Sequence, residues 1–439
     1  MKRSIEKELL NWKQRRDRKP LLVRGARQIG KSYVIEKFGK EHFDSILTIN
    51  FEEMKEVKHT FAGDLTPSFI IRDLATRFRQ PIIPGKTLLF FDEIQACPNA
   101  LHSLRFFKEQ MPELHVIGAG SLLEFIIGDE QFSFPVGRIE FLYMRPLSFN
   151  EFLEAKGEQA ALGWLEEATP NHPVGAGTHA HLIQLIKDYF IVGGMPEAVS
   201  SYIQTNQFYQ IDSIHQNLLN TYENDLGKYP RSSKQKFMAL LFEAAPRLIG
   251  EHFKYAKIHP HAQSRDYLEA IQVLSQIGII HQVFANSASG VPLAVQRNEK
   301  KFKLLFLDIG LIPQTTQSIL DAEDLIQINR GSLAEQFVGQ ELIAYDKPYS
   351  RSILYYWDRE KKGSEAEVDY VIEVGSHIVP IEVKAGAKGR LRSIKQFMDE
   401  KKAPLGIRIS QAPLALEDHI LSIPFYMIQE IPRLITEYT

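Results

Sequence analysis

Eight residues near the start of the chain have the spacing of a phosphate-binding loop. They fit the pattern G-x-x-x-x-G-K-[ST] without a mismatch and are Gly25-Ala26-Arg27-Gln28-Ile29-Gly30-Lys31-Ser32. Glycines let the backbone curl until successive N–H groups point at one anion. The Lys31 ammonium would reach the β- and γ-phosphates of a nucleoside triphosphate, and the Ser32 hydroxyl would ligate Mg²⁺. The pattern therefore predicts a site for ATP and Mg²⁺.

Two acids further along the chain fit the same chemistry. Asp92 and Glu93 follow four apolar residues, Leu88 to Phe91, so we expect them at the C-terminal end of a buried strand. Ligands bind at that edge of a doubly wound sheet. Asp92 would hold the Mg²⁺ through water, and Glu93 would orient and polarise the attacking water. An Asp-Glu pair can also simply cap the next helix, but downstream of a phosphate-binding loop the catalytic interpretation is favoured.

Two more polar residues are candidates for contact with the nucleotide. Ser121 follows the apolar stretch HVIGAG and would sense the γ-phosphate, although a polar residue after a strand is usually a cap. Arg138, in FPVGRIEF, would serve as an arginine finger for the nucleotide of a neighbouring subunit. The alternative for Arg138 is an ordinary ion pair at the surface.

A second group of charged residues lies near the C-terminus, in EVDYVIEVGSHIVPIEVK at 367–384. This stretch predicts a hairpin that turns at Gly-Ser, with residue 374 opposite 377 and therefore Asp369 opposite Glu382. Lys384 would project from the same face as Glu382. Like charges held opposite each other destabilise a sheet unless something neutralises them, and Mg²⁺ or Mn²⁺ would do so. The alternative is a charged surface hairpin, and Pro380 in the second strand could shift the register through a bulge.

The segment after the hairpin is basic. Residues 384–397 contain no acid and carry Lys384, Lys388, Arg390, Arg392 and Lys395. Such a run either borders a phosphate-backbone groove or is a solvated helix start. Four histidines elsewhere fit no zinc-binding spacing, so we interpret them as ordinary surface or core residues: His115, His252, His259 and His261.

The first candidate site requires strands and helices in alternation, and the N-terminal third of the chain has that pattern. Apolar strands are expected at 21–24, 46–51, 87–93 and 115–120, with a helix from about Lys31 to Phe38. Continuous apolar strands between helical segments indicate a parallel sheet that is covered on both faces. The fold class is therefore α/β, with several domains.

The remainder of the chain changes pattern several times. Residues 146–234 are expected to form a helical lid, and residues 235–302 show two helices followed by a hairpin, as in a winged helix. A winged helix would contact DNA or dock a protein. The expected domains are thus a P-loop domain at 1–145, the lid, the winged helix and a C-terminal α/β domain at 303–439.

Composition limits the classes of function. The chain has 439 residues and a net charge of −2, so no global basic field marks it as a nucleic-acid binder. No apolar run is long enough for a membrane span, and the N-terminus lacks the apolar core of a secretory signal. One cysteine, Cys97, can form neither an internal disulfide nor a cysteine-built zinc site. These features favour the reducing cytoplasm, and no membrane partner is expected.

Five segments together resemble AAA-type ATPases, in particular a prokaryotic group with a P-loop domain and a C-terminal domain of unknown function. They are RGARQIGKS, TLLFFDEIQ, GRIEFLYMRPLSFNEFL, YFIVGGMPEA and FLDIGLI. The resemblance covers nearly the whole chain. It implies a nucleotide-binding core, a helical lid, a winged helix and a nuclease-like C-terminal fold, and it implies no particular substrate.

The spacing D-x₁₂-E-x-K also resembles the PD-(D/E)XK nuclease superfamily, which has the restriction-endonuclease-like fold. That resemblance implies that Asp369 and Glu382 are metal ligands and that Lys384 orients water and stabilises the phosphorane. Glu335, on the preceding helix, matches an additional acid of the family, and Gln396 matches a polar residue of some members. This sequence departs from the pattern because Glu-Val, rather than a proline, precedes Asp369.

Three functions remain open from the sequence. The first is an ATP-hydrolysing protein whose nuclease-like C-terminal domain acts on DNA with a second Mg²⁺ or Mn²⁺. The second is a nucleotide-switched regulatory or scaffold ATPase that docks a protein or DNA partner without cleavage. The third is a homo-oligomeric motor that assembles through Arg138.

Overall fold

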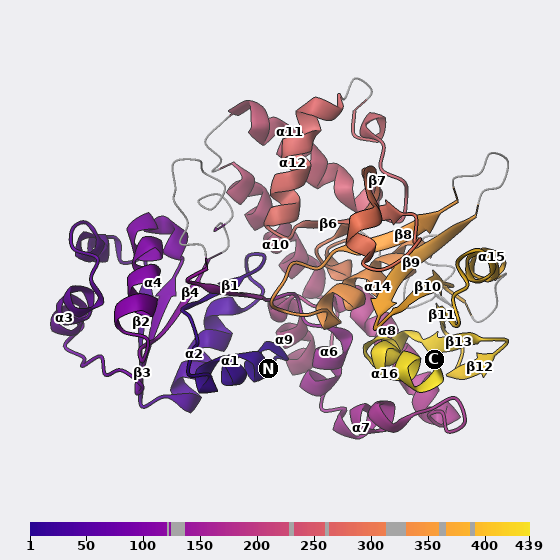
Figure 1. The fold of residues 1–439 in the computed structure, drawn as a ribbon, viewed down its shortest axis with the longest axis horizontal. Coiled ribbons are helices and arrows are strands. Elements are labelled where there is room, and N and C mark those ends of the chain that lie inside the picture. The colour runs from indigo at the N-terminus through magenta and orange to yellow at the C-terminus, as the bar shows by residue number, and fades with distance from the viewer. Residues whose placement is uncertain are drawn as a thin grey trace. The chain divides into compact units, whose positions relative to one another are not determined.

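The structure is a computed structural model that describes residues 1–120, 123, 137–227, 232–259, 263–312, 331–359, 366–386 and 391–439. The chain divides into two compact units. The N-terminal unit consists of Lys2–Arg145 and Lys347–Arg351, and the C-terminal unit of Met1, Pro146–Asp346 and Ser352–Thr439. Figure 1 shows their helices and strands.

The N-terminal unit is built on a five-stranded sheet in which every pairing is parallel, in the order β2-β3-β4-β1-β5. The strands are β1 (Leu21–Arg24), β2 (Ser45–Asn50), β3 (Thr87–Asp92), β4 (His115–Ala119) and β5 (Glu140–Tyr143). All six residues of β3 are buried, as expected for a strand covered on both faces. The predicted parallel α/β sheet is thus confirmed, and β5 is an edge strand that the sequence pattern did not indicate.

Helices join these strands and supply the rest of the core. They are α1 (Ile5–Gln14), α2 (Lys31–His42), α3 (Pro67–Phe78) and α4 (Pro98–Gln110), with short 3₁₀ turns at η1 (Lys55–Phe61) and η2 (Ile94–Ala96). α2 packs on β2, β3 and β4. Phe51, Phe61 and Phe91 meet edge to face or tilted, with ring centroids 5.4–5.6 Å apart. This aromatic core holds the carboxyl end of β3 in place.

The C-terminal unit begins with helices. They are α6 (Phe149–Lys156), α7 (Gln159–Glu167), α8 (Ala176–Val192), α9 (Pro196–Thr205), α10 (Ile211–Leu226), α11 (Ser232–Ala244) and α12 (Ser264–Gln276). The Ser148 side chain and Glu151 form a reciprocal capping box that starts α6. None of the helices in the described ranges combines the length and apolar character that crossing a bilayer requires.

An eight-stranded mixed sheet completes this unit, in the order β12-β13-β11-β10-β9-β8-β6-β7. Its strands are β6 (Ile280–Asn286), β7 (Arg297–Phe306), β8 (Leu354–Asp358), β9 (Glu367–Val374), β10 (His377–Val383), β11 (Gly406–Ser410), β12 (Ala415–Glu417) and β13 (Ile420–Pro424). The later helices are α14 (Ser332–Tyr345), α15 (Arg392–Lys401) and α16 (Ile431–Tyr438), and η9 (Phe425–Glu430) leads into the last of them. α14 packs against β7 and β10, and α15 packs against β9, β10 and β11.

The hairpin expected to be the wing of a winged helix is part of this sheet. β6 pairs with β7 on one side and runs parallel to β8 on the other. The expected return strand also begins later, because Leu293–Gln296 form a 3₁₀ turn and β7 continues to Phe306. A separate winged helix at 235–302 is therefore not confirmed: β6 satisfies its second edge by pairing with β8, which lies some 70 residues further along the chain.

Three of the segments behind the family resemblance meet in a buried polar junction, which we define as Leu147, Tyr189, Gly194, Asp308 and Gln340. Asp308 accepts hydrogen bonds from the Gly194 N–H at 2.7 Å and the Gln340 side chain at 3.1 Å. The Gln340 amide also donates to the Tyr189 hydroxyl at 3.0 Å, which donates to the Leu147 carbonyl at 2.5 Å. The junction thus joins segments that are far apart in the sequence within one unit.

Candidate nucleotide site and C-terminal charge cluster

The predicted phosphate-binding loop lies between β1 and α2. Its backbone takes conformations with positive φ at Gly25, Gln28 and Gly30, and Gly30 caps α2. A Cβ on Gly25 would lie 2.2 Å from the Met144 carbonyl oxygen, so no larger residue fits this position. The loop therefore curls ahead of a helix N-terminus, where the helix dipole favours an anion.

The Lys31 side chain is buried and turned back onto the loop. Its Nζ donates to the Gly25 carbonyl at 3.1 Å and to the Ala26 carbonyl at 2.7 Å. Burial lowers the pKa of Lys31 to about 8, although the Glu93 and Asp92 carboxylates act in the opposite direction. Both hydrogen-bond partners shown for the ammonium are uncharged, so an anion in the loop would be a more favourable partner.

Ser32 and Asp92 come together as predicted. The Ser32 hydroxyl donates to Asp92 Oδ2 at 2.8 Å, at the carboxyl end of β3. Burial raises the pKa of Asp92, and the hydrogen bond from Ser32 offsets part of this rise. A hydroxyl oxygen and a carboxylate at this separation are hard oxygen donors of the kind that Mg²⁺ prefers, so the pair fits that ion.

Glu93 takes a left-handed backbone conformation directly after the strand, with φ of 46°. Its Oε2 accepts a hydrogen bond from Gln95 Nε2 at 2.6 Å. A non-glycine residue in this conformation is uncommon and is often found at functional sites. Gln95 is a neighbour of Glu93 that the sequence pattern did not indicate.

The second candidate site lies on β9 and β10 of the C-terminal unit. Val374 pairs with His377 and Val371 with Pro380, so the predicted register is confirmed from the turn to Tyr370 and Ile381, and Pro380 does not shift it. The predicted pair of Asp369 and Glu382 would be the next one and lies beyond the end of this ladder. The irregularity occurs instead between β9 and β8, where the pairing shifts between Tyr355 and Trp357. A bulge changes the direction of nearby side chains, and bulges are common next to active sites.

Asp369 and Tyr370 lie on β9 at this irregularity, between the residues that pair with Tyr355 and Trp357. The Tyr370 hydroxyl donates to the Glu335 carbonyl at 2.8 Å, while the Asp369 charge also acts on Glu335. Consecutive residues of a regular strand would point to opposite faces. Asp369 Oδ2 accepts a hydrogen bond from the Val383 N–H at 2.7 Å. The Asp369 carboxylate thus accepts this N–H of β10 in place of a backbone carbonyl.

Two lysines form ion pairs with three of the four carboxylates of this cluster. Lys384 Nζ pairs with Glu382 Oε1 at 2.5 Å. Lys303 Nζ, on β7, lies 2.5 Å from Glu367 Oε1 and 3.4 Å from Glu335 Oε2. We call these six residues the charge cluster: Lys303, Glu335, Glu367, Asp369, Glu382 and Lys384.

The pKa values of the charge cluster show opposed effects of burial and charge. Burial raises the pKa of Glu335, Asp369 and Glu382, and the lysines only partly offset this rise. Burial by itself would lower the pKa of Lys303, but the charges of Glu335, Glu367 and Asp369 outweigh it and raise that pKa. Lys303 is therefore firmly an ammonium ion.

Family models match three consecutive parts of the chain. Residues 17–153 match the model of the AAA domain. The N-terminal unit contains an AAA domain. Residues 183–319 and 330–426 match two domains of unknown function (DUF8612 and DUF4143), so these matches assign no activity to the C-terminal unit. No curated protein matches the sequence.

Solved structures resemble the chain only at low identity. A Walker-type ATPase of Pyrococcus abyssi is 15% identical with a TM-score of 0.44, over 71% of this chain and 94% of that chain. The Aeropyrum pernix ORC1 protein in complex with DNA is 12% identical with a TM-score of 0.28, over 74% and 93%. AMPPCP-bound DnaA from Aquifex aeolicus is 11% identical with a TM-score of 0.28, over 62% and 85%. Similarity at this level assigns no function to this chain.

The two other nucleotide-binding candidates, Arg138 and Ser121, add no support to the nucleotide site. Arg138 is exposed and its Nε pairs with Glu109 Oε1 at 2.9 Å, which is the surface ion pair that the sequence left open. Ser121 lies outside the described residues. Arg3, which the sequence did not indicate, is buried and donates to the carbonyls of Ile29 at 3.0 Å and Arg145 at 2.6 Å. Arg3 thus links the phosphate-binding loop of the AAA domain, through Ile29, to the backbone of Arg145.

The structure does not support the expected second metal. In the described parts of the chain, no three His, Cys, Asp or Glu side chains are arranged to hold a metal ion. Lys303 and Lys384 bring two positive charges to these carboxylates and so offset part of their repulsion. The sequence did not indicate Lys303, Glu367 or His252, whose Nε2 lies 2.6 Å from Glu367 Oε2. The one local signal was a lysine within the apolar end of a strand, KFKLLF at 301–306.

The basic run after β10 is only partly described. Lys388 and Arg390 lie outside the described residues. Lys395 pairs with Asp418 at 3.4 Å, and Gln396 donates to Glu400 on the same helix at 3.2 Å, so Gln396 makes no recorded hydrogen bond to the charge cluster. Arg392 begins α15 and is exposed. The described part of the run thus has the properties of a solvated helix start.

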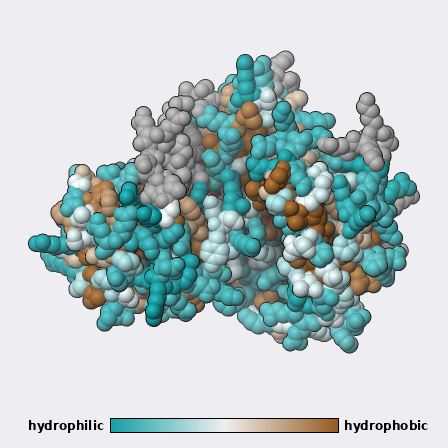
Figure 2. Space-filling view, viewed as in Figure 1, coloured by the Kyte–Doolittle hydropathy of each residue, from teal (hydrophilic) through white to brown (hydrophobic). Residues whose placement is uncertain are grey.

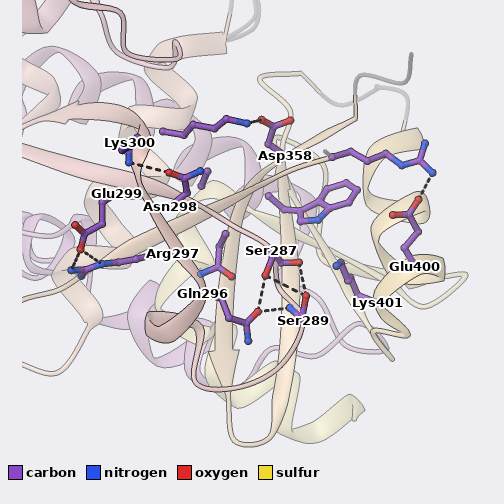
Figure 3. Close-up of a pocket in the computed structure, with 15 residues that line it drawn as sticks. Ser287, Ser289, Gln296, Arg297, Asn298, Glu299, Lys300, Asp358, Glu400 and Lys401 are labelled. Atoms are coloured by element: carbon purple, nitrogen blue, oxygen red, sulfur yellow. Dashed lines mark hydrogen bonds and ion pairs between the residues drawn. The ribbon is translucent and has the colours of Figure 1, made fainter. Parts of the chain in front are cut away.

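A polar pocket of about 710 Å³ opens elsewhere in the C-terminal unit, between residues of β6, β7, β8 and α15. Figure 3 shows its ion pairs and hydrogen bonds, including Arg297 with Glu299 at 2.7 Å and Ser287 with Gln296 at 2.9 Å. Its lining contains five basic side chains (Arg297, Lys300, Lys301, Arg359, Lys401) and three acidic ones (Glu299, Asp358, Glu400). The pocket is therefore polar with an excess of two positive charges.

Proposed function

We propose that the AAA domain binds ATP with Mg²⁺ and hydrolyses it. The observation that carries this proposal is the convergence of Lys31, Ser32 and Asp92 around a curled loop at a helix N-terminus. Lys31 would leave the Gly25 and Ala26 carbonyls and bind the phosphates. Ser32 and Asp92 would hold Mg²⁺, which supplies charge neutralisation of the phosphates when bound. Glu93 would leave Gln95 and orient the attacking water.

The proposal is tested by a substitution that removes the Lys31 ammonium from the loop. Lys31→Ala should lose ATP binding and hydrolysis, because it removes the buried ammonium that lies against the backbone of the loop. Lys40→Ala is the matched control, since Lys40 lies on the same helix, is exposed and pairs with Glu36 at 3.7 Å. Calorimetry with ATP and Mg²⁺ and an assay of phosphate release measure the two steps. Equal activity in Lys31→Ala and the wild type would contradict the proposal.

We further infer that the nucleotide controls how the C-terminal unit docks a protein or DNA partner, without cleavage of that partner. The polar pocket, with its excess of two positive charges, supports an anionic partner surface. The division into a lid at 146–234, residues 235–302 and a C-terminal domain at 303–439 remains part of this proposal. So does assembly into a homo-oligomer.

Metal-dependent cleavage of DNA is the second candidate function. What favours it is that Glu335, Asp369, Glu382 and Lys384, which the nuclease resemblance implies, act on one another electrostatically in a single cluster. What opposes it is that Lys303 already pairs with Glu335, one of the implied ligands, and that its charge acts on Asp369, another of them.

A further inference from the structure

Lys303 is an unusual residue for the interior of a sheet. Its side chain is 6% exposed, and its Nζ lies 5.4 Å from the centre of the Tyr356 ring. A buried ammonium is costly unless it is paired and hydrogen bonded. Lys303 meets this requirement through Glu367 and Glu335, which come from β9 and α14.

Neighbouring groups keep the partners of Lys303 in place. Glu367 Oε2 pairs with His252 Nε2 at 2.6 Å, and His252 Nδ1 lies 3.1 Å from the Tyr356 hydroxyl. His252 also forms an isolated backbone bridge with Lys303. The ammonium is thus held by groups from four segments of the chain, rather than by one mobile side chain.

Two of the three carboxylates that act on Lys303 are among those that a metal would need. Glu335 and Asp369 belong to the set of ligands that the nuclease resemblance implies, and Glu382 completes it. Lys384 takes Glu382 Oε1, whereas Glu382 Oε2 is buried without a hydrogen-bond partner among the described residues. A divalent ion at these oxygens would face a buried ammonium. If that ammonium withdrew to water, Glu335 would lose its ion pair and Glu367 would keep only the one with His252 among the described residues.

We propose that Lys303 is the resident cation of the charge cluster, and that the cluster therefore excludes divalent metal ions. Glu335 and Glu367 share one internal ammonium as their ion-pair partner instead of Mg²⁺ or Mn²⁺. The cluster then serves to hold β7, β9, β10 and α14 together, and it supplies no metal-activated water. This inference concerns the C-terminal unit alone and does not depend on whether the AAA domain hydrolyses ATP.

The experiment removes the ammonium and keeps the length of the side chain. Binding of Mn²⁺ to the full chain is measured by calorimetry, without nucleotide, in the wild type, Lys303→Met and Lys303→Met/Asp369→Asn. The Asp369→Asn change separates this site from any Mn²⁺ bound by the AAA domain, and Asn can still accept the hydrogen bond from Val383. We expect Lys303→Met to bind Mn²⁺ at least about tenfold more tightly than the wild type at a site that the double variant loses.

Lys301→Met is the matched control, because Lys301 lies on the same strand but is half exposed and pairs with Asp358 at 3.6 Å. It should bind Mn²⁺ as the wild type does. A folded Lys303→Met chain without the new site would overturn the proposal. If Lys303→Met does not fold, the comparison of wild type with Asp369→Asn remains decisive: a wild-type Mn²⁺ site that Asp369→Asn abolishes overturns the proposal, and equal binding by the two supports it.

Discussion

At the scale of single residues, Lys31 determines how the nucleotide site responds to pH. Its ammonium is buried and has only two neutral carbonyls as hydrogen-bond partners, so the pKa of Lys31 is lowered to about 8. A phosphate would supply opposite charge and raise that pKa again. The free chain at pH 8 thus holds about half a proton less on Lys31 than the complex would.

This difference predicts that ATP binding takes up protons near pH 8. Affinity should be nearly constant below about pH 7 and fall by up to about tenfold for each pH unit above pH 8, because the neutral amine must first be protonated. Calorimetry in two buffers of different ionisation enthalpy measures the uptake. Lys31→Arg should remove the pH dependence, since a guanidinium stays charged. Affinity that is constant from about pH 7 to pH 9.5 in the wild type would contradict the assignment.

At the scale of elements, the polar junction brings together short segments that lie far apart in the sequence. Gly194 lies directly against Leu147, and an added Cβ would be 2.2 Å from the Leu147 carbonyl oxygen. Asp308 requires the Gly194 N–H as a donor at 2.7 Å. The segments FLDIGLI, YFIVGGMPEA and LSFNEFL thus contribute to packing within the C-terminal unit.

The junction predicts a large effect from a small substitution. Gly194→Ala should lower the free energy of unfolding of the C-terminal unit by about 1–3 kcal/mol, because the methyl group must displace a backbone carbonyl. Gly163→Ala is the control: Gly163 lies within α7 with nothing within 4 Å of the added Cβ, and alanine favours a helix. Thermal denaturation followed by circular dichroism compares the two. Equal melting temperatures would show that the junction tolerates the extra volume.

At the scale of the whole molecule, the balance of charge limits which partner the C-terminal unit can dock. The net charge is −2, and Figure 2 shows that hydrophilic residues cover most of the described surface on the face in view. Hydrophobic residues there form separate patches. Attraction of a phosphate backbone must therefore come from local groups such as the lining of the polar pocket.

The full chain with circular DNA, ATP and Mg²⁺ or Mn²⁺ tests this limit. We expect the DNA to remain intact, because a divalent ion at the charge cluster would lie beside the buried Lys303 ammonium, which already pairs with Glu335. If DNA is the partner, its affinity should fall steeply with salt, since phosphate contacts release counterions. Nicking that Asp369→Ala abolishes and Lys31→Ala leaves unchanged would instead establish the second candidate function.

Much of the nucleotide site could be predicted because its information is local. The loop from Gly25 to Ser32 and the pair Asp92-Glu93 are contiguous, and an apolar run before the acids suffices to place them at the end of a strand. The register of β9 and β10 was predictable for the same reason, since a two-residue turn determines which residues face each other. No such local rule connects Arg3 to the loop that it holds.

The amino-acid sequence alone thus determined the parallel sheet, the phosphate-binding loop and the set of acids near the C-terminus. Only the tertiary structure decided what those acids do. Lys303 lies more than 60 residues before Asp369, and strand pairing brings them together because β6 pairs with β8 and carries β7 into the same sheet. Charge is neutralised by whatever lies nearest in space, and a pattern of spacing along the chain cannot show whether that is a metal ion or a lysine.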